Sequence, residues 1–207
     1  MLSADSPDEK DYLMRLQRLT EGVFSVHSIT AVQARRLLRS AEHAEVWEQA
    51  SVISSDARGG SGSRVDEKSR SGSVWLVPHD ESAALPLHRA LKRTLMPLIQ
   101  HEWNLQVEDY EAIQVVRYRA GQRYAAHEDV RSPGDGRCFT VLWALNADYT
   151  GGATAFPRIG ISWNGAPGEA LVFPSNYLHA AQAVGRGTKY VAVTWIVRPV
   201  TNAWLYG

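Results

Sequence analysis

The sequence predicts a mainly β fold, a sandwich or jelly roll with helices packed on one sheet. Helical patterns of apolar residues are confined to the first hundred residues, whereas the second half is a series of short apolar runs. Turn signals separate these runs at Gly151-Gly152, Asn164-Gly165 and Pro167-Gly168. Helices followed by a succession of strands are typical of sheets that carry helices on one side.

Length and composition are those of an ordinary globular protein. The chain has 207 residues, 44% hydrophobic and 21% charged, which is enough for a single domain over residues 1–207. Lys+Arg and Asp+Glu both number 22, so the net charge of zero gives no reason to expect nucleic acid or a membrane surface as partner. Cys138 is the single cysteine, and neither a signal peptide nor a membrane span is evident, so we expect a cytoplasmic protein.

The chain begins with a predicted helix and a predicted strand. Apolar residues between Tyr12 and Leu19 recur at helical spacing, which predicts a helix from Asp8 to about Thr20. The segment GVFSVHSI, residues 22–29, then predicts a short strand.

Two further helices are predicted before residue 103. Thr30 is expected to cap the first of them. Its buried stripe is predicted to consist of Val32, Leu37, Leu38 and Ala41. Residues from Glu81 to about His101 predict one long helix, which Pro97 should kink or divide.

Residues 54–73, SSDARGGSGSRVDEKSRSGS, are rich in serine, glycine and charge and almost without apolar side chains. Such a segment buries too little surface to offset the entropy lost on ordering. Two interpretations stay open, a disordered surface loop and a mobile lid that closes over substrate.

A candidate metal site begins in YRAGQRYAAHED, which ends on His127 and Asp129. On an extended strand these two side chains share one face, whereas Glu128 points away and is interpreted as a solvated charge. His179, in FPSNYLHAAQ, adds a second histidine, although a core histidine is an alternative there. Two histidines and one carboxylate, with other positions open, are the ligands of non-haem Fe(II) oxygenases.

Lys189, in GRGTKYVAVTW, follows ten residues after His179. One interpretation is a surface lysine at the start of a strand. Its apolar flank indicates instead a strand packed on both sides, where a lysine is costly to bury unless it is paired. A bound carboxylate would be a natural partner.

The remaining candidates are interpreted as structural. His27 and His43 have no metal-binding partner at short spacing. The arginines near the first motif are interpreted as a solvated strand face, with steering of an acidic substrate as the alternative. They are Arg117, Arg119, Arg123, Arg131 and Arg137.

Three blocks together resemble the prolyl 4-hydroxylase-like family of Fe(II)/2-oxoglutarate-dependent dioxygenases. YRAGQRYAAHED resembles its Tyr-x-x-Gly-x-x-Tyr-x-x-His-x-Asp motif. RCFTVLWALNADYTGGATAFP resembles its Arg-x-x-Thr strand, Leu-Asn and Gly-Gly-x-Thr-x-Phe-Pro. PGEALVFPSNYLHAAQAVGRGTKYVAVTW resembles its Pro-x-x-Gly-x-Ala-Leu-x-Phe, distal histidine, Val-x-x-Gly-x-Lys and closing tryptophan.

The resemblance implies a fold and a ligand set. The fold is a double-stranded β-helix (jelly-roll) core over about residues 104–199, with a helical and strand support region over about 8–103 and a mobile loop over about 54–73. The implied metal ligands are His127, Asp129 and His179. The implied cofactors are Fe(II), 2-oxoglutarate and O₂, with ascorbate as an optional reductant.

The resemblance also implies roles around the metal. Lys189 would pair with the distal carboxylate of 2-oxoglutarate, and Tyr118 matches a tyrosine that can contact this co-substrate. Tyr124 and Trp195 match positions near the iron pocket with substrate or packing roles.

The implied reaction is hydroxylation of an unactivated C–H bond, most simply of a prolyl residue or a proline-like substrate, with release of succinate and CO₂. Alternatives are a hydroxylase of a free amino acid or of a natural-product intermediate, and a non-catalytic jelly-roll binding protein. The partner is accordingly a peptide or a small molecule, and the sequence leaves the oligomeric state open.

Two positions depart from the family pattern. Ala144 replaces a frequent tyrosine, and Val193 stands where a threonine is frequent. Thr194, beside Val193, should face the opposite side of its strand. We therefore expect a weaker affinity for 2-oxoglutarate than is usual in the family.

Overall fold

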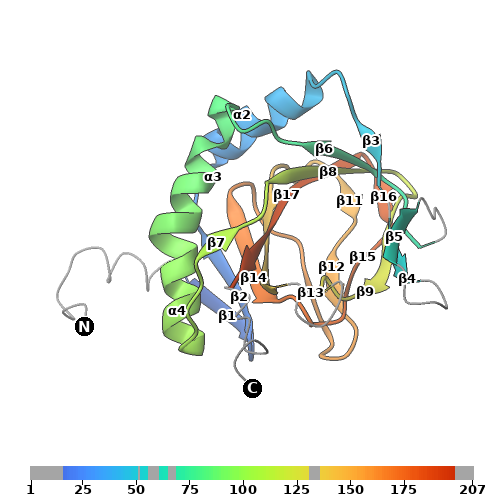
Figure 1. Ribbon diagram of the computed structural model, residues 1–207. Helices are drawn as coiled ribbons and strands as arrows, with labels where there is room; N and C mark the ends of the chain where they lie inside the picture. The colour runs from blue at the N-terminus through green and yellow to red at the C-terminus, as the bar shows by residue number, and fades with distance from the viewer. Residues whose placement is uncertain (1–15, 51, 56–60, 65–68, 131–135, 199–207) are drawn as a thin grey trace.

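The computed structural model describes residues 16–50, 52–55, 61–64, 69–130 and 136–198 (Figure 1). Its larger sheet contains, in spatial order, β1 (Leu16–Thr20), β2 (Val23–His27), β14 (Glu169–Pro174), β10 (Arg137–Ala144), β17 (Thr188–Val197), β8 (Gln114–Arg119), β6 (Ser73–Leu76) and β3 (Glu48–Gln49). A short strand, β7 (Asp109–Tyr110), also pairs with β17. The predicted central strand of residues 137–146 is confirmed, because β10 lies between β14 and β17.

The smaller sheet contains β13 (Ile161–Trp163), β12 (Thr154–Phe156), β15 (His179–Ala181) and β9 (Tyr124–His127). Two additional pairs are β11 (Thr150–Gly151) with β16 (Val184–Arg186), and β4 (Val52–Ser55) with β5 (Ser61–Arg64). All of these strand pairs are antiparallel. The larger and the smaller sheet enclose the cavity that carries the candidate site.

The helices lie beside the larger sheet (Figure 1). They are α2 (Ala31–Glu42), the 3-10 turn η1 (Ser82–Ala84), α3 (Leu85–Ala90), the π-helical turn η2 (Leu91–Leu95) and α4 (Met96–Trp103). One hydrophobic cluster joins helical residues such as Leu37 and Leu95 to Val141 and Trp143 of β10. Two smaller clusters fill the space on the other side of the larger sheet.

The predicted N-terminal helix is wrong at residues 16–20, which form β1 and pair with β2; residues 8–15 lie outside the described residues. Leu16 and Leu19 are three residues apart, which suits one face of a helix. In a strand the same spacing places them on opposite faces, and both faces are covered here. Leu16 packs on the helix-side cluster and Leu19 on a cluster between the sheets.

The predicted strand at residues 22–29 and the Thr30 cap are confirmed. Thr30 Oγ1 accepts a hydrogen bond from Gln33 N–H, and the Gln33 side chain accepts one from Thr30 N–H, which forms a capping box. The predicted buried stripe was wrong at Val32, which is 62% exposed. Ala34 faces the core together with Leu37 because these two positions lie almost one turn apart.

The predicted long helix is divided. Met96 N–H bonds to Leu91 O five residues back, so the π-helical turn precedes Pro97 in α4. Proline lacks the N–H that a regular helix needs, and the change of register accommodates it. This agrees with the expectation that Pro97 divides the helix.

Within the polar run at residues 54–73, the described residues 54–55 and 61–64 belong to the antiparallel pair of β4 and β5, in which Val52 pairs with Arg64 and Ser55 with Ser61. Whether this region moves over substrate stays a prediction. No helix among the described residues is long and apolar enough to cross a membrane.

Candidate active site

The site lies in a cavity between the two main sheets. The larger sheet contributes alternate residues of β17, among them Lys189, Val193 and Trp195, because strand side chains alternate between faces. The smaller sheet contributes residues such as His127 and His179. A ligand in this cavity would therefore lie between the two sheets.

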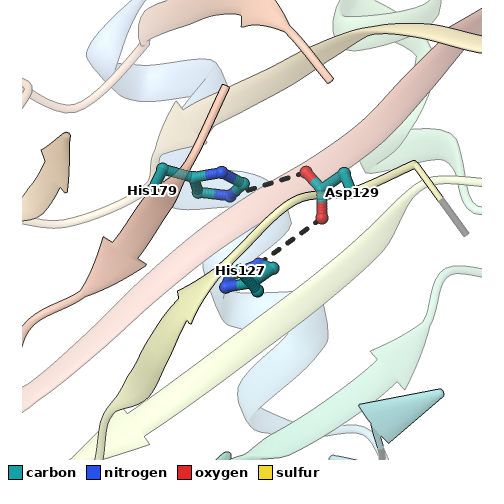
Figure 2. Close-up of side chains that lie close together, drawn as sticks. All are labelled: His127, Asp129 and His179. Carbon is teal, nitrogen blue, oxygen red and sulfur yellow. Dashed lines mark ion pairs between the residues drawn. The ribbon is translucent and has the colours of Figure 1, made fainter. Parts of the chain in front are cut away.

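His127, Asp129 and His179 converge in this cavity (Figure 2). His127 ends β9, His179 begins β15, and the two residues are paired directly across these strands. Asp129 Oδ1 lies 3.5 Å from His127 Nε2, and its Oδ2 lies 3.5 Å from His179 Nε2. The three candidate ligand atoms all lie within 4.8 Å of one another, so one ion can contact all three.

The two imidazole rings are oriented by backbone carbonyls. His127 Nδ1 lies 2.8 Å from Ala125 O, and His179 Nδ1 lies 2.9 Å from Tyr177 O. A carbonyl oxygen only accepts hydrogen bonds, so both Nδ1 atoms carry the proton. A ring whose proton is on Nδ1 presents the lone pair of Nε2 to the site, which is the arrangement that metal-binding histidines use.

Asp129 is held as a carboxylate. Its N–H donates to Ser175 O (2.8 Å), and Thr140 Oγ1 donates to its Oδ2 (2.7 Å). Burial raises its pKa, but its interactions with His127 and His179 and the hydrogen bond from Thr140 outweigh burial and hold the pKa well below its usual range. The site therefore contains a permanent negative charge at neutral pH.

His179 stays neutral in the same environment. It is 4% exposed, and burial lowers its pKa to about 4. Two imidazole nitrogens and one carboxylate oxygen are thus the donors offered. This donor set fits Fe(II), for which two histidines and one carboxylate are characteristic.

Replacing Thr140 with valine is expected to lower the affinity for Fe(II) by about 10- to 100-fold, the usual effect of removing a hydrogen bond to a metal ligand. The measurement is an anaerobic Fe(II) titration of the apoprotein. Thr194→Val is the matched control, because Thr194 Oγ1 donates to Glu111 O, away from the cavity. Equal affinities in the two variants would contradict a role for Thr140 in holding the metal ligand.

Lys189 projects into the cavity from β17, opposite Tyr118 of β8. It is 2% exposed, and Nζ donates to Gly152 O (2.6 Å) and approaches Thr154 Oγ1 (3.5 Å). Burial lowers its pKa to about 8. The ammonium group is therefore costly to keep charged unless an anion joins it.

The backbone near Lys189 leaves space for its long side chain. Gly152 has φ +65°, and a Cβ there would lie 3.3 Å from Lys189 Cδ and 3.1 Å from a Val184 methyl group. Glycine relieves both constraints. Gly152, in the predicted Gly151-Gly152 turn, therefore leaves room for the Lys189 side chain.

The three aromatic residues suggested by the sequence also line the cavity. Tyr118 is 5% exposed and Trp195 is 8% exposed. The Tyr124 ring stacks on the His127 ring, with centroids 3.5 Å apart and planes inclined by 18°. Trp195 Nε1 is buried and has no hydrogen-bond partner among the described residues, so it is a donor available to a ligand.

Arg137 corrects one interpretation made from the sequence. Arg137 is not part of a solvated strand face. Its side chain is 9% exposed and pairs with both Glu111 carboxylate oxygens at 2.6 Å. Its guanidinium lies 3.7 Å from the Trp195 ring centroid, and Nη1 donates to Asp129 O (3.2 Å). The sequence signal was its place in the Arg-x-x-Thr block with Thr140.

The other arginines of that group differ. The Arg117 guanidinium lies 4.1 Å from the Trp47 ring centroid, whereas Arg119 and Arg123 are exposed. Arg131 lies outside the described residues. His43 lies at the C-terminus of α2, where its Nδ1 bonds to Arg39 O. Glu128 lies 3.7 Å from exposed Arg158, as expected for a solvated charge.

The two departures from the family pattern have different surroundings. Ala144 packs in a hydrophobic cluster with Phe156 and Phe173. Val193 lines the cavity, whereas Thr194 faces away, as predicted. Thr154, which sequence reasoning missed, places a hydroxyl beside Lys189. The weaker affinity for 2-oxoglutarate stays a prediction.

Comparison with known proteins agrees with this geometry. The sequence model of the 2OG-Fe(II) oxygenase superfamily matches residues 113–197. A putative prolyl 4-hydroxylase of Acanthamoeba polyphaga mimivirus is 26% identical over 155 residues, 65% of this chain and 64% of that protein. A PKHD-type hydroxylase of Sphingopyxis alaskensis is 34% identical over 92 residues, 40% of this chain and 42% of that protein.

The match to the 2OG-Fe(II) oxygenase superfamily is confined to residues 113–197. The matched region contains the three converging ligands and Lys189. The matched family model and the His-Asp-His cluster together indicate Fe(II), 2-oxoglutarate and O₂ as metal, co-substrate and oxidant. The chain spans less than two thirds of the length of these curated relatives.

Solved structures of prolyl hydroxylases share the fold of this chain. A Trichoplax adhaerens prolyl hydroxylase, in complex with a hypoxia-inducible factor peptide fragment, aligns with a TM-score of 0.76 at 17% identity, covering 97% of this chain and 94% of that one. A Pseudomonas putida prolyl 4-hydroxylase aligns with a TM-score of 0.67 at 21% identity, covering 86% and 93%. The predicted jelly-roll core is confirmed.

Proposed function

We propose that the protein is an Fe(II)- and 2-oxoglutarate-dependent hydroxylase. His127, Asp129 and His179 would hold the iron, and Lys189 would bind the distal carboxylate of 2-oxoglutarate. The observation that carries the proposal is the presence, in one cavity, of three oriented metal ligands and a buried ammonium group. Burying the ammonium group of Lys189 costs hydration free energy, and a bound anion would offset that cost, whereas a purely structural role would not.

The residues divide the work between binding and orientation. When bound, the iron supplies the redox chemistry by which O₂, 2-oxoglutarate and the substrate become CO₂, succinate and the hydroxylated product. Asp129 offsets part of the metal charge, and Lys189 fixes the far end of the co-substrate. Tyr118, which pairs with Lys189 across the neighbouring strand and lines the cavity, would contact the co-substrate.

We propose a prolyl residue or a proline-like group as the substrate. The relatives named as prolyl hydroxylases support this class, and the Trichoplax enzyme is seen with a peptide. Tyr124 and Trp195 offer aromatic surfaces in the cavity, which suit a small apolar ring. A free amino acid or natural-product intermediate remains the alternative small-molecule substrate. The cytoplasmic location remains a prediction, as does the organisation of residues 1–207 as a single domain with a support region, a mobile loop and a jelly-roll core.

The test is substrate-dependent succinate release, measured with short prolyl peptides and with free L-proline. We expect at least one prolyl peptide to stimulate succinate release and to gain one oxygen atom. His179→Ala should abolish both signals. Stimulation by free proline alone would move the substrate to the small-molecule class. A folded, iron-loaded protein that releases no succinate with or without any of these substrates would contradict the proposed enzyme.

A further inference from the structure

Arg70 lies in a short segment added to the open edge of the smaller sheet. Ala125 N–H donates to Ser69 O (2.7 Å), and Ser71 N–H donates to Arg123 O (2.9 Å). Arg123 N–H also donates to Ser71 Oγ (3.0 Å). The backbone is thus held on both sides of Arg70, which fixes the base of its side chain.

The chain then crosses closely to the larger sheet. Gly72 has φ +155°, and a Cβ there would lie 3.1 Å from Arg117 O and 3.2 Å from the Tyr118 ring. Ala50 N–H donates to Gly72 O (3.0 Å), and β6 begins at the next residue. Only glycine permits this close approach without displacing its neighbours. The segment that carries Arg70 is therefore built against the wall of the cavity.

The guanidinium of Arg70 lies at the cavity, beside the Tyr124 ring. Arg70 lines the cavity, and its Cζ lies 4.5 Å from the Tyr124 ring centroid. The Tyr124 ring also stacks on His127, one of the three converging candidate ligands. Burial raises the pKa of Tyr118 and of Tyr124, and the charge of Arg70 acts in the opposite direction on both. Both phenols therefore experience this positive charge.

The charges around the cavity favour anionic ligands. Among the described lining residues, Arg70 and Lys189 are the basic side chains and Asp129 is the carboxylate. Fe(II) and the 2-oxoglutarate dianion cancel one another, so one positive charge remains in the loaded site. A positive, partly dehydrated cavity attracts anions. Arginine in particular presents a planar pair of N–H donors that matches a carboxylate.

We propose that Arg70 is a second carboxylate-binding residue of this cavity, separate from Lys189. The inference rests on the proposed function. The carboxylate has two possible sources, the 2-oxo acid end of 2-oxoglutarate and an acidic group carried by the substrate. In either case the guanidinium donates hydrogen bonds to the carboxylate, while Lys189 binds the distal carboxylate of the co-substrate.

The first arm of the test uses co-substrate binding to the full chain loaded with Fe(II) without oxygen. Arg70→Gln is compared with Arg70→Lys, with Lys189→Met and with Arg119→Gln, which removes an exposed arginine outside the cavity lining. Pyruvate is the probe, because it has the 2-oxo acid but lacks the distal carboxylate. If the co-substrate is the source, Arg70→Gln weakens pyruvate and 2-oxoglutarate binding about 10- to 100-fold. Lys189→Met then weakens 2-oxoglutarate alone.

The second arm uses the best prolyl peptide in two versions, with Asp or Asn beside the proline. If the substrate is the source, Arg70→Gln raises KM for the Asp peptide about tenfold or more, with kcat and 2-oxoglutarate affinity unchanged. The Asn peptide should show no such rise, and Arg70→Lys should restore part of the preference. A merely structural role for Arg70 would change both peptides alike.

The outcomes separate this inference from the proposed function. If Arg70→Gln matches Arg119→Gln in both arms while the wild type binds Fe(II) and 2-oxoglutarate, the role of Arg70 is overturned alone. If the wild type binds no Fe(II)–2-oxoglutarate pair, the proposed function fails and this inference fails with it.

Discussion

Replacing Asp129 with alanine is expected to lower kcat/KM for hydroxylation by more than about a hundredfold. Changes to the residues that merely support a metal ligand already cost about 10- to 100-fold. Asp129 is the single anionic donor among the three ligands, and it lies 3.5 Å from Nε2 of both histidines. The measurement is the yield of hydroxylated product and succinate at saturating Fe(II).

Glu128→Ala is the matched control for Asp129→Ala. Glu128 is the adjacent carboxylate, but it lies near exposed Arg158 rather than in the metal cluster. We expect this control to retain wild-type turnover. An Asp129→Ala protein that kept full turnover would show that the three ligands have been wrongly assigned.

Replacing Lys189 with methionine is expected to weaken 2-oxoglutarate binding about a hundredfold or more. Removing one partner of a buried charge pair costs about 3 to 5 kcal/mol. Methionine approximates the length of the lysine stem without its charge, so the cavity walls should persist. The measurement is calorimetric titration of the Fe(II)-loaded protein with 2-oxoglutarate in the absence of oxygen, with exposed Lys92→Met as the control.

The pH dependence of binding supplies an internal check. The pKa of Lys189 in the free protein is lowered to about 8 by burial, so the amine loses its proton as pH rises above that value. Because the carboxylate binds the protonated amine, wild-type Kd should rise by up to about tenfold per pH unit above pH 8. Lys189→Met should lack this slope. An identical slope in both proteins would exclude Lys189 as the titrating group.

The sequence predicted correctly those features that depend only on neighbouring residues. Alternation along a strand placed Val193 toward the cavity and Thr194 away from it, because the period of two is fixed by backbone geometry. The Thr30 cap was equally local. The prediction of a helix at residues 16–20 was wrong. Two leucines three residues apart fit one face of a helix, but they also fit a strand whose two faces are both covered, and only the tertiary contacts decide between these structures.

The convergence of the candidate ligands required more than spacing. His127 and Asp129 lie close in sequence, but His179 reaches them by pairing of β15 with β9, which no local pattern encodes. Thr140 and Arg137 were missed as contacts of Asp129 for the same reason. Arg70 was hidden in a run whose serines and glycines indicated a loop. Its ordering comes from hydrogen bonds to the edge of β9, which are independent of side-chain hydrophobicity.

The most direct measurement of the central claim is an anaerobic titration of the apoprotein with Fe(II) and 2-oxoglutarate, followed by visible absorption. The account predicts a weak charge-transfer band when both are present. It also predicts that the band disappears in His179→Ala, although that variant keeps its fold by circular dichroism. A folded wild-type protein that shows no band would contradict the account and leave a jelly-roll protein whose cavity binds something else.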